Sequence, residues 1–148
     1  MKTKAFISTC IVALAICSVA KAQKLKNAIV PASVTAALKD KYPKAGKVTW
    51  EKEKGNYEAN WGGKSGEDMS VLFTPSGSFV EQVEAIKPEA LPAPAMSYLK
   101  DHYKGTKVKE AGKVTDAAGK ITYEAEVKKL EVVFDEQGKF VKAREEND

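Results

Sequence analysis

The chain has 148 residues, of which 24 are Lys or Arg and 20 are Asp or Glu, giving a formal net charge of +4. Lys2, Lys4 and Lys21 lie in an N-terminal segment, and the rest of the chain is nearly neutral. Basic and acidic residues are interspersed there, as at residues 51–54, so we expect neither nucleic acid nor an anionic membrane as a partner. Both cysteines also lie in the N-terminal segment, which excludes a disulfide framework in the remainder.

Residues 1–22 have the pattern of a cleaved export signal peptide. Lys2 and Lys4 precede an uncharged apolar run over residues 5–19, and residues 20–22, Ala-Lys-Ala, form a small-x-small cleavage site. The run is shorter than the roughly 20 apolar residues of a transmembrane helix. We therefore expect cleavage before Gln23 and a periplasmic or secreted protein without membrane insertion.

Lipid anchoring at Cys17 is the alternative interpretation of this segment. Residues 14–17 resemble a lipobox, but Ile16 is bulky where such sites carry a small residue. Because a complete cleavage site follows, we expect the mature chain to begin at Gln23 rather than at a lipid-modified cysteine.

The remaining chain contains an internal repeat. The segment 38–42 recurs at 99–103 and the segment 71–80 recurs at 132–141, both 61 residues further on. Tyr57-Glu58-Ala59 returns as Tyr123-Glu124-Ala125, 66 residues further on, so the two copies differ in loop length. The sequence predicts a first repeat over residues 23–87 and a second over residues 88–148.

Each repeat is predicted to begin with a short helix. In the first, Pro31 and Ser33 suit a first turn, Val34 and Leu38 lie on one face, and Pro43 ends the helix. The second copies this design from Pro92 to Tyr103. Helices of about three turns need a larger partner to pack against.

That partner is predicted to be an antiparallel sheet, because short turns separate segments with strand patterns. Each helix is followed by three such segments, with a further strand left open in each repeat. The segments are residues 48–50, 57–61, 71–73 and 79–80 in the first repeat, and 108–114, 121–127, 130–134 and 139–144 in the second. The fold class is therefore α+β, with two α-β-β-β repeats that share a core or a continuous sheet and place their helices on one face.

Strand alternation divides the side chains between two faces of this sheet. We assign Tyr57, Ala59 and Trp61 to the core beneath the helices. The opposite, open face would then carry the candidate binding residues Glu58, Asn60, Glu124 and Glu126. The inverse assignment would expose an aromatic platform suited to a protein or a sugar.

Trp50 is a further candidate for the binding face. Glu110 stands near the corresponding position of the second repeat, so the tryptophan is not a feature of both copies. Packing in the local core is the simpler interpretation, and the sequence leaves both open.

The motifs of the repeat resemble the PepSY-like family, also labelled β-lactamase-inhibitor-like. They are the Tyr-Pro at residues 42–43, the segment 48–51, Tyr57-Glu58-Ala59 and a Phe-x-x-x-Gly-x-Phe hairpin, and the resemblance covers nearly all of residues 31–144. It implies helices on one side of an antiparallel sheet and a free concave face on the other. In the best-known relative in shape that face binds a hydrolase, but no inhibitory loop of that relative matches this sequence.

No catalytic set is evident in the sequence. His102 is the one histidine and the predicted mature chain has no cysteine, so neither a zinc-type ligand set nor a cofactor is expected. Paired carboxylates such as Glu58 and Glu124 could serve acid–base chemistry, although the polar face of a half-buried strand explains them equally.

We therefore expect an exported, non-catalytic module that binds an unidentified protein partner through its open sheet face. A small-ligand or glycan-binding domain is the alternative, and an enzyme ranks third. The sequence predicts neither the partner nor the oligomeric state.

Overall fold

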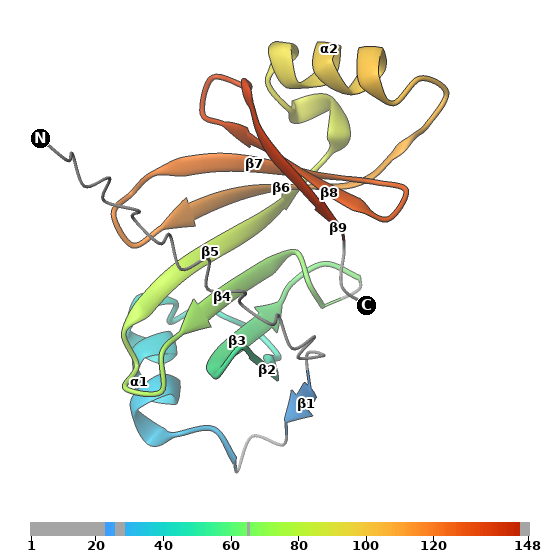
Figure 1. Ribbon diagram of the computed structural model, residues 1–148. Coiled ribbons are helices and arrows are strands. Elements are labelled where there is room, and N and C mark those ends of the chain that lie inside the picture. The colour runs from blue at the N-terminus through green and yellow to red at the C-terminus, as the bar shows by residue number, and fades with distance from the viewer. Residues whose placement is uncertain (1–22, 26–28, 65, 146–148) are drawn as a thin grey trace, which may run out of the picture.

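The structure is a computed structural model, and it describes residues 23–25, 29–64 and 66–145. The expected signal peptide lies outside the described residues. Within them, two α-helices and a short 3-10 helix accompany nine strands that form one sheet (Figure 1). The elements are β1 Gln23–Leu25, α1 Ala32–Lys41, β2 Thr49–Glu53, β3 Asn56–Trp61, β4 Met69–Phe73, β5 Phe79–Ile86, η2 Pro88–Ala90, α2 Ala93–His102, β6 Val108–Asp116, β7 Ile121–Val127, β8 Leu130–Asp135 and β9 Phe140–Glu145.

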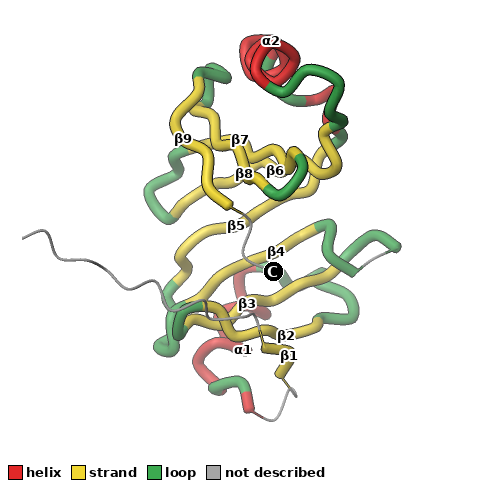
Figure 2. Tube along the Cα trace, turned by 45° about the vertical axis from the view of Figure 1, so that its right-hand side comes forward, coloured by secondary structure: helices red, strands yellow, loops and turns green. Residues whose placement is uncertain are grey.

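The strands are arranged in the sheet in the order of the chain, and every neighbouring pair is antiparallel. Hairpin-like connections join most of them. There are two exceptions: α1 lies between β1 and β2, and η2 and α2 lie between β5 and β6, where the chain returns to pair Glu81 with Asp116 and Ile86 with Ala111. This ladder makes the sheet continuous from one half of the molecule to the other (Figure 2).

Four strands follow each helix, one more than the three-strand pattern of the expected repeat. The strand left open in the sequence is present both times, as β5 and as β9. The α+β class is confirmed. In β5 and β9 a register irregularity near the preceding hairpin turn shifts the pairing with β4 and β8, which is why alternation weakens there.

Proline begins both helices. Pro31 and Pro92 hold the N-cap positions, and neither cap has a side-chain hydrogen bond. Ser33 lies in the first turn of α1, as expected, and its hydroxyl donates a hydrogen bond to the carbonyl oxygen of Pro75 at 3.1 Å, which connects the helix to the β4–β5 turn. Tyr42 and Tyr103 end the helices by donating backbone N–H groups to Leu38 and Leu99.

Glycine brings each of these turns close to a helix. Gly77 and Gly138 have φ values of 88° and 81°, which favour glycine. A Cβ at Gly77 would lie 2.6 Å from the carbonyl oxygen of Ser33, and one at Gly138 would lie 2.7 Å from the Cβ of Pro92. The turns before β5 and β9 therefore need glycine both for its positive φ and because a side chain would collide with the neighbouring helix.

Each helix covers its own core. Val34 and Leu38 of α1 pack with Tyr57, Ala59 and other residues of β2–β4, and Trp61 is partly buried against them. Under α2 the core residues are Leu91, Ala95, Leu99, Ala111, Ala125, Val127, Val132 and Phe134. The assignment of Tyr57, Ala59 and Trp61 to the helix side is confirmed.

Both cores lie on the same face of the sheet. Ala59 under α1 lies beside Val71, and Val71 lies beside Gln82. Gln82 lies beside Thr115, which shares its face of β6 with Ala111 under α2, because alternate residues of a strand face the same way. The opposite side is the open face of the sheet.

Trp50 is a core residue, which corrects its place among the candidates for the binding face. It is 4% exposed and lies opposite Ala59 in the core under α1. Ala111 has the corresponding position under α2, opposite Ala125, so the residue compared with Trp50 should be Ala111 rather than Glu110. An irregularity in β6 between Val108 and Ala111 shifts the register by the step that the sequence comparison missed.

The core assignment predicts a large loss of stability for Phe73→Ala. Phe73 is 1% exposed and meets Phe79 edge to face at 6.3 Å between ring centroids. Removing it should lower the free energy of unfolding by about 3–5 kcal/mol, measured by urea denaturation. Val141→Ala is the control, because Val141 is 54% exposed, and it should cost about 0.5 kcal/mol or less. Equal losses in the two variants would contradict the core described above.

Candidate functional site

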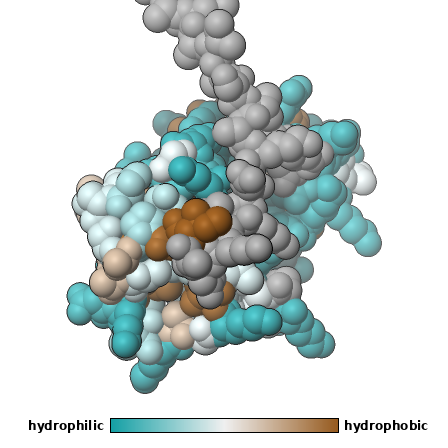
Figure 3. Space-filling model, turned by 90° about the horizontal axis from the view of Figure 1, so that it is seen from below, coloured by the Kyte–Doolittle hydropathy of each residue, from teal (hydrophilic) through white to brown (hydrophobic). Residues whose placement is uncertain are grey.

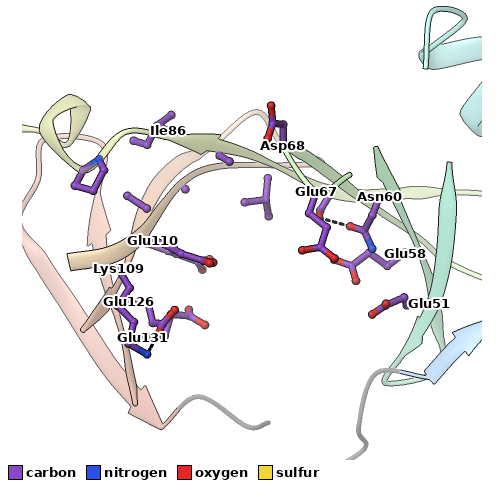
Figure 4. Close-up of a pocket in the computed structure, with 17 residues that line it drawn as sticks. Glu51, Glu58, Asn60, Glu67, Asp68, Ile86, Lys109, Glu110, Glu126 and Glu131 are labelled. Atoms are coloured by element: carbon purple, nitrogen blue, oxygen red, sulfur yellow. Dashed lines mark hydrogen bonds and ion pairs between the residues drawn. The ribbon is translucent and has the colours of Figure 1, made fainter. Parts of the chain in front are cut away.

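The open face of the sheet is hollowed into a cavity of about 600 Å³, here called the acidic cavity (Figure 4). Strands from both halves of the molecule line it. In Figure 4, Glu51, Glu58, Asn60 and Glu67 lie to one side, and Lys109, Glu110, Glu126 and Glu131 lie to the other. The full lining is Glu51, Glu58, Asn60, Glu67, Asp68, Ser70, Val83, Ala85, Ile86, Pro88, Lys109, Glu110, Ala111, Gly112, Glu124, Glu126 and Glu131.

The sheet curls around this cavity. Glu53 at the end of β2 and Arg144 on β9 are separated by six intervening strands in the sheet. Burial acts to lower the pKa of Arg144, but Glu131, then Glu124 and then the charge of Glu53 act to raise it, and the net shift is upward. The two sides of the sheet therefore approach each other across the open face.

The first half of the cavity is a hydrogen-bonded set on β3 and β4. Asn60 is 5% exposed, and its side-chain oxygen accepts a hydrogen bond from the Ser70 hydroxyl. Burial raises the pKa of the Glu58 carboxyl, as do the charges of Glu53 and Glu51, whereas hydrogen bonds from Asn60 and Ser70 lower it. Glu58 is thus held half-buried among hydrogen-bond donors and other carboxylates.

The second half of the cavity carries carboxylates together with basic side chains. Lys109 of β6 pairs with Glu126 of β7. Arg144 of β9 lies 2.5 Å from Glu131 of β8 and 3.6 Å from Glu124 of β7, measured from Nη2 to Oε1. These contacts join four strands through their charged side chains.

Glu124 has the most perturbed carboxyl of the cavity. Burial raises its pKa to about 7, the charge and hydrogen bond of Glu131 act in the same direction, and Arg144 partly opposes them. Burial and the charge of Glu53 also raise the pKa of Glu81. Burial thus disfavours the ionised form of both carboxyls, and the neighbouring carboxylates add to this effect.

The four polar residues predicted for the open face line this one cavity. Glu58 and Asn60 lie on β3, and Glu124 and Glu126 lie on β7. Asn60 was expected to be exposed and is instead almost covered, because Ser70 and Glu58 surround its amide. An even mixture of charges was expected on the surface, and at this cavity that expectation is wrong, because seven of its residues are Glu and one is Asp against one Lys.

Sequence reasoning missed several members of this site. Glu131 and Arg144 alternate with the core residue Val132 and its partner Ala143, so strand parity could have placed them on the open face. Strand parity could not have placed Lys109 on the open face, because the irregularity between Val108 and Ala111 breaks the alternation of β6.

His102 lies away from the acidic cavity, at the end of α2. Its ring stacks on Tyr98 at 3.9 Å between centroids, and its Nδ1 lies 3.0 Å from the Tyr98 carbonyl oxygen.

No group of three or more His, Cys, Asp or Glu residues that could hold a metal is found among the residues the structure describes. Within the same residues, no helix combines the length and the apolar character needed to cross a membrane.

The outer surface shows little apolar area in the view from below (Figure 3). Hydrophilic residues cover most of the visible described surface, and apolar colour is confined to small patches. Large apolar side chains that are exposed in the described chain are Ile29, Phe140 and Val141. The acidic cavity is therefore a more distinctive feature of this surface than any apolar patch.

The fold and the open face define an α+β protein with helices on one side of an antiparallel sheet and a free concave face on the other. The chain belongs to the family described as "Putative beta-lactamase-inhibitor-like, PepSY-like", whose model matches residues 17–81 and again residues 65–142. The family expected from the sequence motifs is confirmed.

Solved structures share this fold. A protein from Bacteroides eggerthii described as "putative periplasmic" is 22% identical with a TM-score of 0.70, covering 80% of this chain and 90% of that one. A DUF2874 family protein from Bacteroides uniformis is 25% identical with a TM-score of 0.68, covering 78% and 88%. A BLIP-like protein from Bacteroides fragilis is 17% identical with a TM-score of 0.63, covering 80% and 88%. No match is found among curated proteins.

The raised pKa of Glu124 predicts a pH-dependent effect of Glu124→Gln. The folded protein holds this proton up to a pKa of about 7, whereas the unfolded chain releases it near 4.5, so the wild-type carboxyl reduces stability as the pH rises through that range. We expect the variant to match the wild type below pH 4.5 and to exceed it by on the order of 2 kcal/mol at pH 8.

Urea denaturation at a series of pH values measures this difference. Glu136→Gln, in the exposed β8–β9 turn, is the matched control for the substitution itself. A stability difference for Glu124→Gln that shrinks as the pH rises would contradict the assigned environment.

Proposed function

We propose that this protein is an exported, non-catalytic binding module that engages a protein partner through the open face of its sheet. Modulation of an envelope or secreted enzyme is one function of this kind. The observation that carries the proposal is the acidic cavity, because one continuous concave face gathers side chains from both halves of the chain. A surface spread over many strands suits a protein partner.

The similar structures support the setting of this proposal. The Bacteroides eggerthii protein is described as "putative periplasmic", which agrees with the export expected from residues 1–22. The BLIP-like description of the Bacteroides fragilis protein agrees with recognition of a protein through a sheet face. The family model matches the chain twice, over residues 17–81 and 65–142, which supports two tandem units. We place them at residues 23–87 and 88–148, each an α-β-β-β repeat extended by one strand.

A small-ligand or glycan-binding function is the second candidate, and the volume of the cavity is what favours it. About 600 Å³ is within the usual range for small-molecule sites. Such sites are mostly apolar, however, and sugar sites present aromatic rings, whereas the residues that line this cavity include no Trp, Tyr or Phe. The lining therefore favours a protein partner with complementary charge.

Affinity capture from the native envelope fraction tests the proposal. The purified protein is compared with the double variant Glu58→Lys/Glu124→Lys, which reverses charge in both halves of the cavity. We expect the amount of captured partner to fall at least about tenfold, since reversed charges at an interface cost several kcal/mol.

The control is Asp40→Lys/Asp101→Lys, which makes the same change in net charge on the exposed sides of α1 and α2. It should leave capture unchanged, and both variants should retain a cooperative thermal transition. Equal capture by the cavity variant and the wild type would show that the open face is not the binding surface.

A further inference from the structure

A second cavity of about 570 Å³, here called the α2 pocket, lies beside the C-terminal half of α2. Residues of η2 and residues 103–108, which lead from α2 into β6, also line it. Pro88 of η2 is the one residue that lines both this pocket and the acidic cavity. The α2 pocket is therefore a separate site with its own set of side chains.

The apolar part of this lining continues the core under α2. Leu99 is 4% exposed and belongs to that core. Met96, Tyr103 and Val108 pack against the core but are only partly buried, and all of them line the pocket. A ligand whose apolar group covered these side chains would remove apolar surface from water, which favours binding.

The charge of the lining is positive. Lys100 in the last turn of α2, Lys104 in the following turn and Lys107 before β6 are exposed and line the pocket. Among the described residues of the lining, only Glu89 has an acidic side chain. The negative end of a helix dipole is equivalent to about half an elementary charge, so the three lysines outweigh it together with Glu89.

These lysine charges have no partner among the residues that the structure describes. Within that part of the chain, none of the three forms an ion pair with a carboxylate. An anionic ligand in the pocket would therefore meet positive charge that the protein has not already compensated.

The helix-and-sheet fold does not require this lining. Tyr42 corresponds to Tyr103 and Trp50 to Ala111, so the 61-residue offset applies throughout the intervening loop. In the first half the positions of Met96, Lys104 and Lys107 are filled by Thr35, Pro43 and Gly46. The Thr35 hydroxyl donates to the carbonyl oxygen of Ala32 at 3.0 Å, within its own helix. Because α1 covers its core with these different residues, the apolar and cationic lining is particular to the second half.

We propose that the α2 pocket binds a small amphipathic carboxylate of the medium-chain fatty acid type, such as octanoate. The hydrocarbon chain would lie on the partly buried apolar side chains, and the carboxylate would lie among Lys100, Lys104 and Lys107. The volume of the pocket is within the usual range for small-molecule sites, which combine apolar lining with a few charged groups. This site is independent of the protein-binding function, because it includes neither Glu58 nor Glu124.

The apolar lining also favours a fatty acid over the C-terminal carboxylate of a peptide. A peptide would place amide groups against Met96, Leu99 and Val108, whose side chains offer them no strong hydrogen-bond partner. A hydrocarbon chain has no such groups to satisfy.

The first test compares ligands on the wild-type protein. Octanoate is titrated at pH 7, below the concentration at which it forms micelles, while the methyl signals of Val108 are followed by NMR. These signals should shift to saturation. Octanol has the chain without the charge and acetate has the charge without the chain, so each should bind at least about fivefold more weakly.

Three results of this comparison would overturn the proposal. Binding of octanol equal to that of octanoate would show that the lysines make no contribution. Binding of acetate equal to that of octanoate would show a site for anions alone. Tighter binding of N-acetyl-leucine than of octanoate would show that the pocket accepts a peptide C-terminus.

The second test changes the lining. Lys104→Gln/Lys107→Gln should weaken octanoate binding about fivefold, and Met96→Thr, which introduces the residue of the first half, about threefold or more. The matched control is Lys44→Gln/Lys47→Gln, which makes the same charge change at exposed positions of the corresponding loop after α1 and should leave binding unchanged. All three variants should retain a cooperative thermal transition. Undiminished octanoate binding to the first two variants, or an equal loss in the control, would overturn the proposal.

Discussion

The hydrogen-bonded ladder between β5 and β6 makes one molecule of two small helix-covered units. Each unit has a three-turn helix and a compact core, close to the lower limit for independent stability. Six residue pairs, from Glu81 with Asp116 to Ile86 with Ala111, join their sheets without a break. The strands approach closely at this ladder, where a Cβ on Gly112 would lie 2.9 Å from Cγ1 of Val83, so a side chain at residue 112 would force the strands to shift.

The ladder also determines which side of the molecule is available for binding. Because the β5–β6 pairing has no register irregularity, alternation carries across it, so both helices cover the same face and the polar residues of both units gather on the other. Carboxylates that would be spread over two separate modules thereby share one cavity, and burial raises the pKa of Glu58 and Glu124 there. The cost of this concentration of charge is compensated in one half by Arg144 and Lys109.

Much of this architecture could be predicted from local patterns in the sequence. Proline before a helical stripe located α1 and α2, and alternation placed Tyr57 and Ala59 in the core and Glu58 on the open face. What could not be predicted depends on register between distant segments. Trp50 was compared with Glu110 instead of Ala111 because a strand irregularity is invisible in the sequence. The continuous sheet was one of two alternatives, since the pairing of β5 with β6 spans the whole of α2. The ion pairs of Arg144 with Glu131 and Glu124 could be recognised only once the structure showed that β9 lies beside β8.

Native-state hydrogen exchange at the β5–β6 ladder tests this account most directly. If the two units form one rigid sheet, the hydrogen-bonded amides of residues 81–86 and 111–116 should exchange with the same free energy as those in the interiors of β3 and β8, through unfolding of the whole molecule. Exchange at the ladder through a separate opening, with a free energy well below that of both interiors, would contradict the account. The acidic cavity would then not persist as one surface.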